Sequence, residues 1–210
     1  MNKATPDAWR NDSLETINYF SELVKEHGIE SSSVDWANRA SQERRFEILA
    51  EIGCLNDCTV LDVGCGLGDL LPWLQQRYMN LKYSGIDVTP DLIAQARRRF
   101  PSADFRICDI LDFNGIPGNY DYAFASGIFY RRKADPYGFM AEILKKMFHY
   151  SRRGVAFNTL STWASHHEKT EFYADPLRTI QLVQQLTRSI VLRHDYHPGD
   201  FTIYLRKTQE

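Results

Sequence analysis

The chain has 210 residues, of which 43% are hydrophobic and 25% charged, a composition that fits one globular domain or one domain with a small accessory piece. Its 25 basic and 27 acidic residues give a net charge of −2, which argues against a nucleic-acid partner bound through its phosphates. The absence of an apolar signal-peptide core and of any apolar run of about 20 residues predicts a cytoplasmic protein with no membrane partner.

The N-terminal segment has the pattern of a helical cap that precedes the main domain. We expect residues 1–53 to form this cap, packed on a domain of residues 54–210. Asp12 resembles the start of a capping box, and apolar residues follow it at helical spacing as far as the stop signal at Gly28. Residues 34–53 predict a second helix, which ends at Gly53.

From Thr59 onward, short apolar segments alternate with helical patterns, which is typical of a parallel sheet buried on both faces. Three of the helices are expected to begin at a capping residue followed by proline: Thr89-Pro90, Asp135-Pro136 and Asp175-Pro176. The predicted strands are residues 59–64, 83–88, 104–109, 121–126, 155–160, 190–196 and 201–207.

The last two predicted strands are joined by only four residues, HPGD, which are too few for a parallel crossover. They should therefore pair as an antiparallel hairpin. The sequence predicts an α/β fold with a doubly wound, seven-stranded, mostly parallel sheet that ends in an antiparallel hairpin and is preceded by N-terminal helices.

The cysteines do not have the spacing of a metal site. Cys54 and Cys58 are four residues apart, but no second pair and no nearby histidine accompanies them. We expect Cys54, Cys58, Cys65 and Cys108 to be reduced and mostly buried thiols, and we expect no metal site.

A glycine-rich turn, VLDVGCGLGDL at residues 60–70, follows the first predicted strand. Alternate glycines allow the backbone to approach a ligand closely. A dinucleotide fingerprint would require glycine at position 69, where this chain has Asp69, and an aspartate there disfavours a pyrophosphate at the helix start. A nicotinamide-dependent oxidoreductase therefore remains only as an alternative.

Two further acids stand at strand ends. Asp87 lies nineteen residues after Gly68 at the end of the second predicted strand, where a carboxylate can accept both ribose hydroxyls. Asp109 ends the third predicted strand and is placed to accept an adenine amino group, with Ile110 against the ring. Together the three strand ends predict a site for a nucleoside without phosphates.

These segments resemble the motifs of the class I S-adenosylmethionine-dependent methyltransferases. VLDVGCGLGDL is similar to the first motif, GIDVTPDLI to the second, ADFRICDI to the third and YDYAFASGIF to the fourth, and the resemblance covers about residues 45–207. It implies the Rossmann-like fold of that family, S-adenosylmethionine as cofactor, S-adenosylhomocysteine as product, and methyl transfer by in-line displacement.

Carried over residue by residue, the resemblance also implies a set of cofactor contacts. Glycines of the first motif would line the methionine part of the cofactor, with Asp62 near its amino group and Ser126 beside the methionyl end. Arg45 could pair with the methionine carboxylate, and Trp36 and Gln42 could cover the cofactor. The implied cofactor-binding residues are Asp62, Gly64, Gly66, Gly68, Asp87, Val88, Asp109, Ile110, Ser126 and Arg45.

Three histidines are candidates for a general base. His166 and His167 lie in an aromatic-rich insertion, residues 161–176, which is long enough to close over the pocket as a lid, with Trp163, Phe172 or Tyr173 walling the substrate. His197 follows the sixth strand. An exposed turn without a role in proton transfer is the alternative interpretation of the insertion.

The fourth motif lacks the Asn/Asp-Pro-Pro-aromatic stretch of enzymes that methylate nucleic-acid bases. Together with the acidic balance, this favours a small-molecule acceptor over DNA or RNA. A protein side chain remains an alternative acceptor, and a methyltransferase-like protein that binds the cofactor without catalysis is an alternative to an enzyme. The basic run at residues 131–133 is the one whose charge could serve a ligand.

Overall fold

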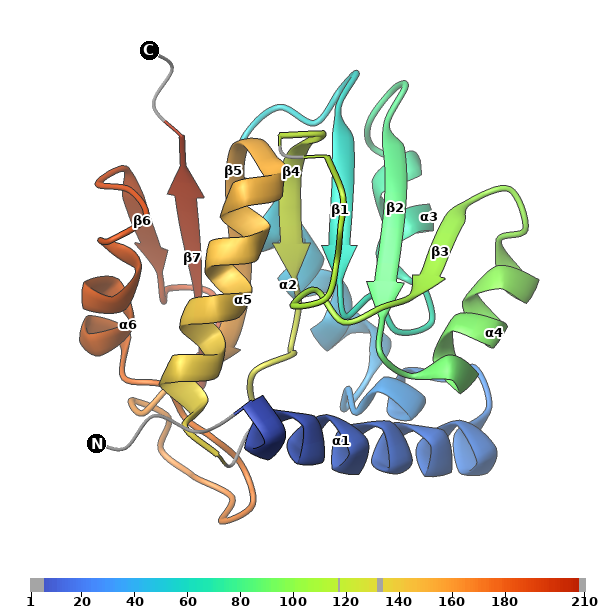
Figure 1. The fold of residues 1–210 in the computed structure, drawn as a ribbon, viewed down its shortest axis with the longest axis horizontal. Helices are drawn as coiled ribbons and strands as arrows, with labels where there is room; N and C mark the ends of the chain where they lie inside the picture. The colour runs from blue at the N-terminus through green and yellow to red at the C-terminus, as the bar shows by residue number, and fades with distance from the viewer. Residues whose placement is uncertain (1–5, 117, 132–133, 208–210) are drawn as a thin grey trace.

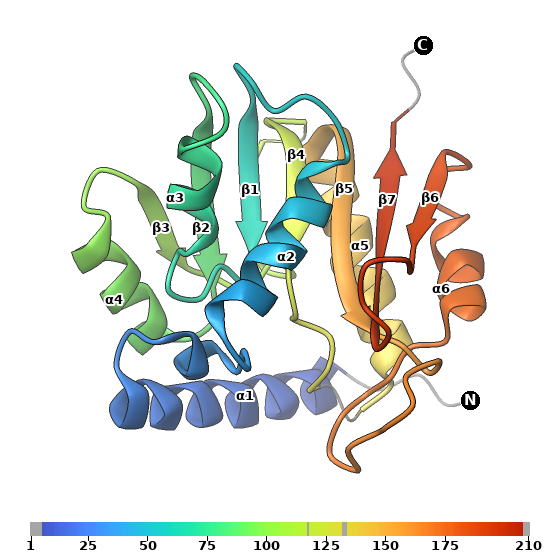
Figure 2. The ribbon, with the colours of Figure 1, turned by 180° about the vertical axis from the view of Figure 1, so that it is seen from behind.

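The computed structural model describes residues 6–116, 118–131 and 134–207, which form a seven-stranded sheet with helices on both faces (Figures 1 and 2). The strand order is β3-β2-β1-β4-β5-β7-β6. The strands are β1 (Thr59–Val63), β2 (Lys82–Asp87), β3 (Asp104–Ile107), β4 (Tyr120–Ala125), β5 (Ser151–Leu160), β6 (Ile190–Arg193) and β7 (Asp200–Arg206).

The direction of the strands confirms the predicted fold class. Strands β1 to β5 pair in parallel, whereas β7 is antiparallel to both β5 and β6. The short connection between β6 and β7 cannot cross the sheet, so the chain turns back. The arrowhead of β7 accordingly points opposite to those of β1, β2 and β4 in Figure 1.

The sheet separates the core into two main apolar clusters, one on each of its faces. In Figure 1, α5 lies in front of the sheet, and Figure 2 shows α2 and α3 against the opposite face. One cluster joins α5 to the sheet around Phe157, and the other joins α2 and α3 to it around Phe124. The helices are α1 (Pro6–His27), η1, a 3-10 turn (Ser31–Val34), α2 (Arg39–Ala50), α3 (Leu70–Gln75), α4 (Pro90–Arg99), α5 (Pro136–Tyr150) and α6 (Pro176–Val183).

The three predicted proline starts are all found, but their caps differ. The Asp135 and Asp175 carboxylates each accept a hydrogen bond from the amide three residues on, as an N-cap does. The Thr89 side chain makes no such bond at the start of α4. The Thr89 amide donates to Asp87, so this bond ties the start of α4 to the end of β2.

The N-terminal helices differ from the sequence-based expectation. Helix α1 begins at Pro6 rather than near Asp12, because proline is tolerated in a first turn. Asp12 lies inside the helix, where its carboxylate accepts the Ala134 amide at 3.1 Å. The helix stops at Gly28, which has the expected left-handed backbone with φ of 66°.

The second predicted helix is shorter at both ends. Ser31–Val34 forms a 3-10 turn, and Asp35 adopts a left-handed backbone (φ 60°) that interrupts the helical path. Helix α2 then begins after Asn38, whose side chain accepts the Ser41 amide at 2.8 Å, and it ends at Ala50, before Gly53.

Helix α1 lies across the edge of the sheet to which β1, β2 and β4 point (Figure 1). Val24 of α1 packs with Leu67 of the glycine loop and Leu92 of α4, and Val34 of η1 joins the same cluster. The N-terminal segment therefore covers the edge at which a doubly wound sheet binds its ligands.

Within the described ranges, no helix is long and apolar enough to span a membrane. The same residues hold no cluster of three or more histidine, cysteine, aspartate or glutamate side chains arranged for a metal ion. All four cysteines are free: Cys58 and Cys65 are buried, Cys108 is half-buried and Cys54 is exposed.

Candidate active site

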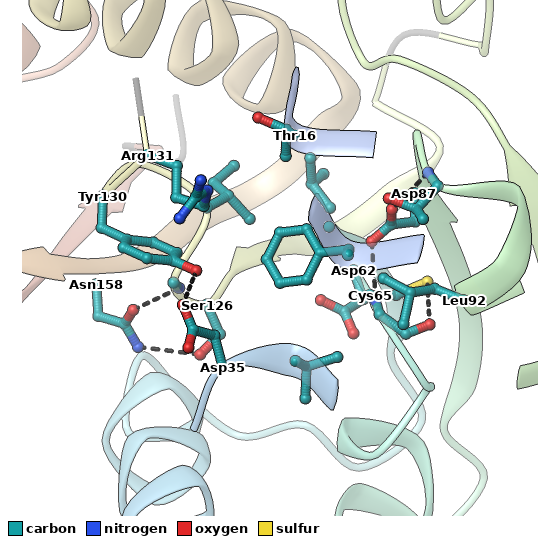
Figure 3. A pocket seen from close by; sticks show the side chains of 18 of the residues that line it. Thr16, Asp35, Asp62, Cys65, Asp87, Leu92, Ser126, Tyr130, Arg131 and Asn158 are labelled. Carbon is teal, nitrogen blue, oxygen red and sulfur yellow. Dashed lines mark hydrogen bonds between the residues drawn. The ribbon is translucent and has the colours of Figure 1, made fainter. Parts of the chain in front are cut away.

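A cavity of about 260 Å³ lies at the carboxyl edge of the sheet, between the strand ends and the N-terminal helices. Its floor comes from the loops after β1, β2, β3, β4 and β5, and its cover includes Thr16 and Phe20 of α1 together with Trp36. Figure 3 shows Asp62 and Asp87 on one side of this space and Tyr130, Arg131 and Asn158 on the other. The cavity thus has two halves, one over β1 to β3 and one over β4, β5 and β7.

The glycine loop brings backbone close to the cavity. Gly64, Gly66 and Gly68 all have left-handed φ values, between 54° and 76°, at which side chains are strained. A Cβ on Gly64 would lie 2.3 Å from Ile128, and one on Gly66 would lie 2.9 Å from Val34. These two glycines line the cavity, and neither position has room for a side chain.

Gly68 is required for packing rather than for the cavity wall. It is not among the lining residues, and a Cβ there would lie 2.6 Å from the ring of Phe105. The structure thus separates Gly68 from the other two glycines of the predicted cofactor set.

Asp62 is a buried acid on the cavity wall. Only 3% of its surface is exposed, and one carboxylate oxygen accepts the Tyr83 hydroxyl at 2.6 Å. Burial raises the pKa of Asp62 to about 7, while the bond from Tyr83 acts in the opposite direction. A cation placed beside this carboxylate would favour its charged form.

Asp87 is held by two backbone amides. Its two oxygens accept the Gly66 amide at 3.0 Å and the Thr89 amide at 2.8 Å. Burial raises the pKa of Asp87, and these hydrogen bonds oppose that rise. The carboxylate therefore ties β2 to the glycine loop and keeps a fixed position on the wall of the cavity.

The remaining strand-end residues predicted from the sequence also line the cavity. Val88, Asp109 and Ile110 lie over β2 and β3, and Asp109 accepts the Leu111 amide at 2.9 Å. Ser126 lines the cavity after β4 and accepts the Asn158 side-chain amide at 3.1 Å, as Figure 3 shows.

Arg45 does not offer the free guanidinium that a methionine carboxylate would need. It lines the cavity at 5% exposure, but its Nε and one terminal nitrogen bind Asp200 at 2.7 and 2.6 Å. The other terminal nitrogen donates to the Ser41 carbonyl and hydroxyl. Arg45 is thus held in an internal ion pair, whereas Trp36 and Gln42 line the cavity.

The three candidate histidines do not reach the cavity. His166 is exposed and contacts Glu168 at 2.8 Å, and the exposed His167 ring lies 4.2 Å from that of Tyr173. His197 accepts the Gly199 amide through Nδ1 at 3.1 Å. Trp163 is also exposed, at 54%, whereas Glu171 of the same insertion lines the cavity and Phe172 packs against the core.

Several lining residues were missed by the sequence patterns. Tyr130 donates to Asp35 at 2.5 Å, and Tyr19 of α1 donates to the same oxygen at 3.0 Å (Figure 3 shows the first bond). The Arg131 guanidinium lies 3.5 Å from the centre of the Tyr19 ring. Burial and the bond to Asp35 raise the pKa of Tyr130, which keeps its hydroxyl protonated.

Only Arg131 of this group had a signal in the sequence, as part of the basic run. Its neighbours at 132 and 133 lie outside the described residues. Asp35, Tyr130 and Glu171 come from irregular segments without a motif, so their approach to the cavity depends on the tertiary fold.

The lining is acidic and incompletely hydrogen-bonded. Acids outnumber arginines on the wall, and arginine neutralises two of those acids, Asp69 and Asp200, directly. Among the described residues, the buried side-chain oxygens without a hydrogen-bond partner are those of Thr89, Thr159 and Asp200. All three residues line this cavity, as is expected where a polar ligand completes the hydrogen bonds of buried groups.

Comparisons with known proteins identify the family. A family model described as a methyltransferase domain matches residues 60–147. A Mycobacterium tuberculosis protein named as a methyltransferase is 38% identical over 159 residues, which cover 71% of this chain and 93% of the relative. The trans-aconitate 2-methyltransferase of Afipia carboxidovorans is 34% identical over 104 residues, which cover 45% of this chain and 40% of that enzyme.

The fold is shared with solved methyltransferases. Magnesium protoporphyrin IX methyltransferase from Synechocystis, solved with bound S-adenosylhomocysteine, has a TM-score of 0.67 at 12% identity over 94% of this chain and 100% of its own. The backbone of the glycine loop and the buried Asp62 and Asp87 fit S-adenosylmethionine, a phosphate-free cation, so the oxidoreductase alternative is not retained. The chain belongs to the class I S-adenosylmethionine-dependent methyltransferases.

Proposed function

We propose that this enzyme transfers a methyl group from S-adenosylmethionine to a small-molecule acceptor held over β4, β5 and β7. The observation that carries the proposal is the cavity of about 260 Å³, which continues from the strand ends of β1 to β3 into a second half beneath α1 and Trp36. The partial relatives that act on trans-aconitate also take a small acceptor, which supports this substrate class.

In the cofactor half of the cavity, different residues would bind the adenosine part and the methionine part of S-adenosylmethionine. Asp87 would accept the ribose hydroxyls, and Asp109 would accept the adenine amino group. Val88 and Ile110 supply apolar surface for the adenine ring. Asp62 is the buried carboxylate that suits the ammonium group.

The methionine part would lie along the glycine loop. Gly64 and Gly66 line the cavity with backbone, because Ile128 and Val34 leave no space for a side chain there, and Ser126 also lines the wall. Arg45 and Gly68 are not among the proposed contacts. Arg45 forms an ion pair with Asp200, and Gly68 packs against Phe105.

The segment up to residue 53 would act as a cap over the main domain of residues 54–210. Its helix α1 crosses the ligand edge of the sheet, and Asp35 connects it to Tyr130 and thus to the loop after β4. A cover at this edge limits the access of water to the reacting groups, and it disfavours a macromolecular acceptor because a side chain or base would have to enter beneath α1.

The cofactor supplies an electrophilic methyl group on a sulfonium. The protein's task is then to orient the acceptor for in-line attack, and positioning of this kind can contribute about 7–11 kcal/mol. Asp35 and Glu171 are carboxylates of the acceptor half that could take a proton from an acceptor, whereas the three histidines lie elsewhere. Asp35 already accepts two phenolic hydroxyls and Glu171 only one, that of Tyr173, which leaves Glu171 as the better candidate.

A transfer assay with methyl-labelled S-adenosylmethionine tests the proposal. The protein would be incubated with fractionated small metabolites, and in parallel with total protein and total RNA. We expect label in the small-molecule fraction, lost in Asp87→Asn, which removes the charge proposed to bind ribose. Label confined to protein or RNA would contradict a small acceptor.

A further inference from the structure

The acceptor half of the cavity contains a buried carboxylate oxygen without a partner. Asp200 opens β7, is 4% exposed and lines the cavity. Arg45 binds one oxygen of this carboxylate, Oδ2, through both Nε and a terminal nitrogen, at 2.7 and 2.6 Å. The other oxygen, Oδ1, has no hydrogen-bond donor among the described residues.

Its nearest titratable neighbour does not satisfy it. His197 Nδ1 lies 3.4 Å from Oδ1, but this nitrogen accepts the Gly199 amide at 3.1 Å and so carries no proton in the neutral ring. Burial also lowers the pKa of His197, which keeps the ring neutral near pH 7. Asp200 Oδ1 therefore receives no hydrogen bond from the neutral His197 ring.

A carboxylate held in this way is rarely left without a donor. Buried polar atoms in proteins are nearly always bonded, and an unpaired charged oxygen is costly. The Arg45 side chain also donates to Ser41 and lies 5.2 Å from the centre of the Trp36 ring, and both of its bonds to Asp200 go to Oδ2. The unpaired Oδ1 points to a donor supplied by a ligand.

A second atom in the same part of the cavity has the same property. Thr159 of β5 is 4% exposed and lines the cavity, and its hydroxyl has no partner among the described residues. The next residue, Leu160, pairs in register with Asp200, so the two unpaired groups come from adjacent strands at one edge of the sheet. Two such groups over β5 and β7 lie away from Asp87 and Asp109, the acids proposed to bind the nucleoside.

We propose that Asp200 is an acceptor-binding residue, whose Oδ1 receives an N–H or O–H group of the molecule to be methylated. This inference rests on the proposed function, since it places the acceptor over β5 and β7. It restricts the substrate class to compounds with a hydroxyl or amine donor, and it makes the Arg45–Asp200 pair the element that orients them.

Asp200→Asn tests the proposal with little change of shape. In the variant, Arg45 donates to the amide oxygen, which leaves the amide NH₂ at the position of Oδ1. An acceptor of hydrogen bonds is thereby replaced by a donor, and a ligand N–H or O–H loses its partner.

Matched probes separate the donor from size and charge. Binding to the complex with S-adenosylhomocysteine would be measured by ligand-observed NMR for phenol against anisole, and for benzylamine against benzyltrimethylammonium. The first pair differs in an O–H donor, and the second keeps the cation while removing the N–H donors. Which pair shows a preference distinguishes a hydroxyl acceptor from an amine.

In the wild type we expect the donor-bearing member of at least one pair to bind about tenfold more tightly. In Asp200→Asn this ratio should fall to within about twofold, while the Kd of S-adenosylhomocysteine stays within about twofold of wild type. The matched control is Asp121→Asn. Asp121 is also buried and paired with arginines, but it lies at the start of β4, away from the cavity at the carboxyl ends of the strands. It should keep the wild-type ratio.

Two results would overturn the inference: equal or absent binding of both members of each pair to the wild type, or a donor preference that survives in Asp200→Asn. Either would mean that Oδ1 is bonded by ordered water rather than by the acceptor. A wild-type protein that fails to bind S-adenosylhomocysteine would instead contradict the proposed function, so the two failures are distinguishable.

Discussion

Replacement of Asp62 by asparagine should stabilise the apo protein while weakening its hold on the cofactor. Asp62 is 3% exposed, and burial raises its pKa to about 7. The ordinary value in an unfolded chain is about 3.9. The folded protein therefore keeps a proton on Asp62 that the unfolded chain loses, throughout the range between about pH 4 and pH 7.

The sign of the pH dependence follows from this difference. Because the folded state binds the extra proton, stability falls as pH rises from about 4, and the loss is complete above about pH 7. Three pH units correspond to about 4 kcal/mol, which is the order of magnitude of the cost of the buried charge. The asparagine side chain of the variant would keep an oxygen for the Tyr83 hydroxyl and carry no charge, so it avoids this cost.

Thermal unfolding of the apo protein between pH 5 and pH 8.5 measures the effect. We expect the Tm of Asp62→Asn to exceed that of wild type by only a few degrees at pH 5 and by on the order of 10 °C at pH 8, given about 2–4 °C per kcal/mol for a chain of this size. Asp112→Asn is the control, since Asp112 is exposed. At pH 8 the Kd of S-adenosylhomocysteine should rise about tenfold in Asp62→Asn, because the ammonium group loses a charged partner.

A difference in Tm that does not change with pH would refute the reasoning, because the cost would then not come from ionisation. A variant less stable than wild type at pH 8 would refute it as well. That result would mean that the carboxylate contributes more through its bond with Tyr83 than its burial costs.

Three further predictions concern other parts of the site. Asp87→Ala should raise the Kd of S-adenosylhomocysteine in calorimetry at least tenfold and also lower Tm, because the Gly66 and Thr89 amides lose their acceptor; an unchanged Kd would remove Asp87 from the site. Gly68→Ala should lower the free energy of unfolding by about 1–3 kcal/mol in urea titrations, because of its φ of 76° and the contact with Phe105, and an unaffected variant would argue against the packing role. Alanine at His166, His167 or His197 should leave kcat within about twofold in the transfer assay, and a loss of a hundredfold or more would restore that histidine as a general base.

The fold was predictable because its signals are local. Glycine alternation at residues 64–68, the proline starts of three helices and the four-residue connection between the last predicted strands each constrain the chain within a short segment. The strand-end positions of Asp87 and Asp109 then follow from topology alone, since parallel strands end at one edge of the sheet. The starts of the two N-terminal helices, which lack such a signal, were less predictable, as the 3-10 turn and left-handed Asp35 before α2 show.

The acceptor half of the site was not predictable in this way. Arg45 and Asp200 pair across 155 positions in the sequence, and Tyr130 meets Asp35 across 95. No periodicity or motif relates such residues, because each comes from a segment whose path depends on packing. The histidines show a related limit. The loops that carry them follow strands and so reach the ligand edge, but the sequence does not say which of their side chains turn toward the cavity.

The cost of the buried acids explains why the cavity can remain acidic. Asp62 and Asp87 both have pKa values raised by burial, so ionisation of these two carboxyl groups lowers the stability of the empty protein. A bound cation would offset this cost, and anything that binds the folded state alone stabilises it in proportion to the logarithm of its concentration over Kd. The destabilising charges are therefore the same groups that would favour a sulfonium and an ammonium over a neutral nucleoside. The buried acids of the cofactor half thus lower the stability of the empty protein but favour a cationic ligand. In the acceptor half, Arg45 already neutralises Asp200, whose unpaired oxygen would instead favour a ligand that donates a hydrogen bond.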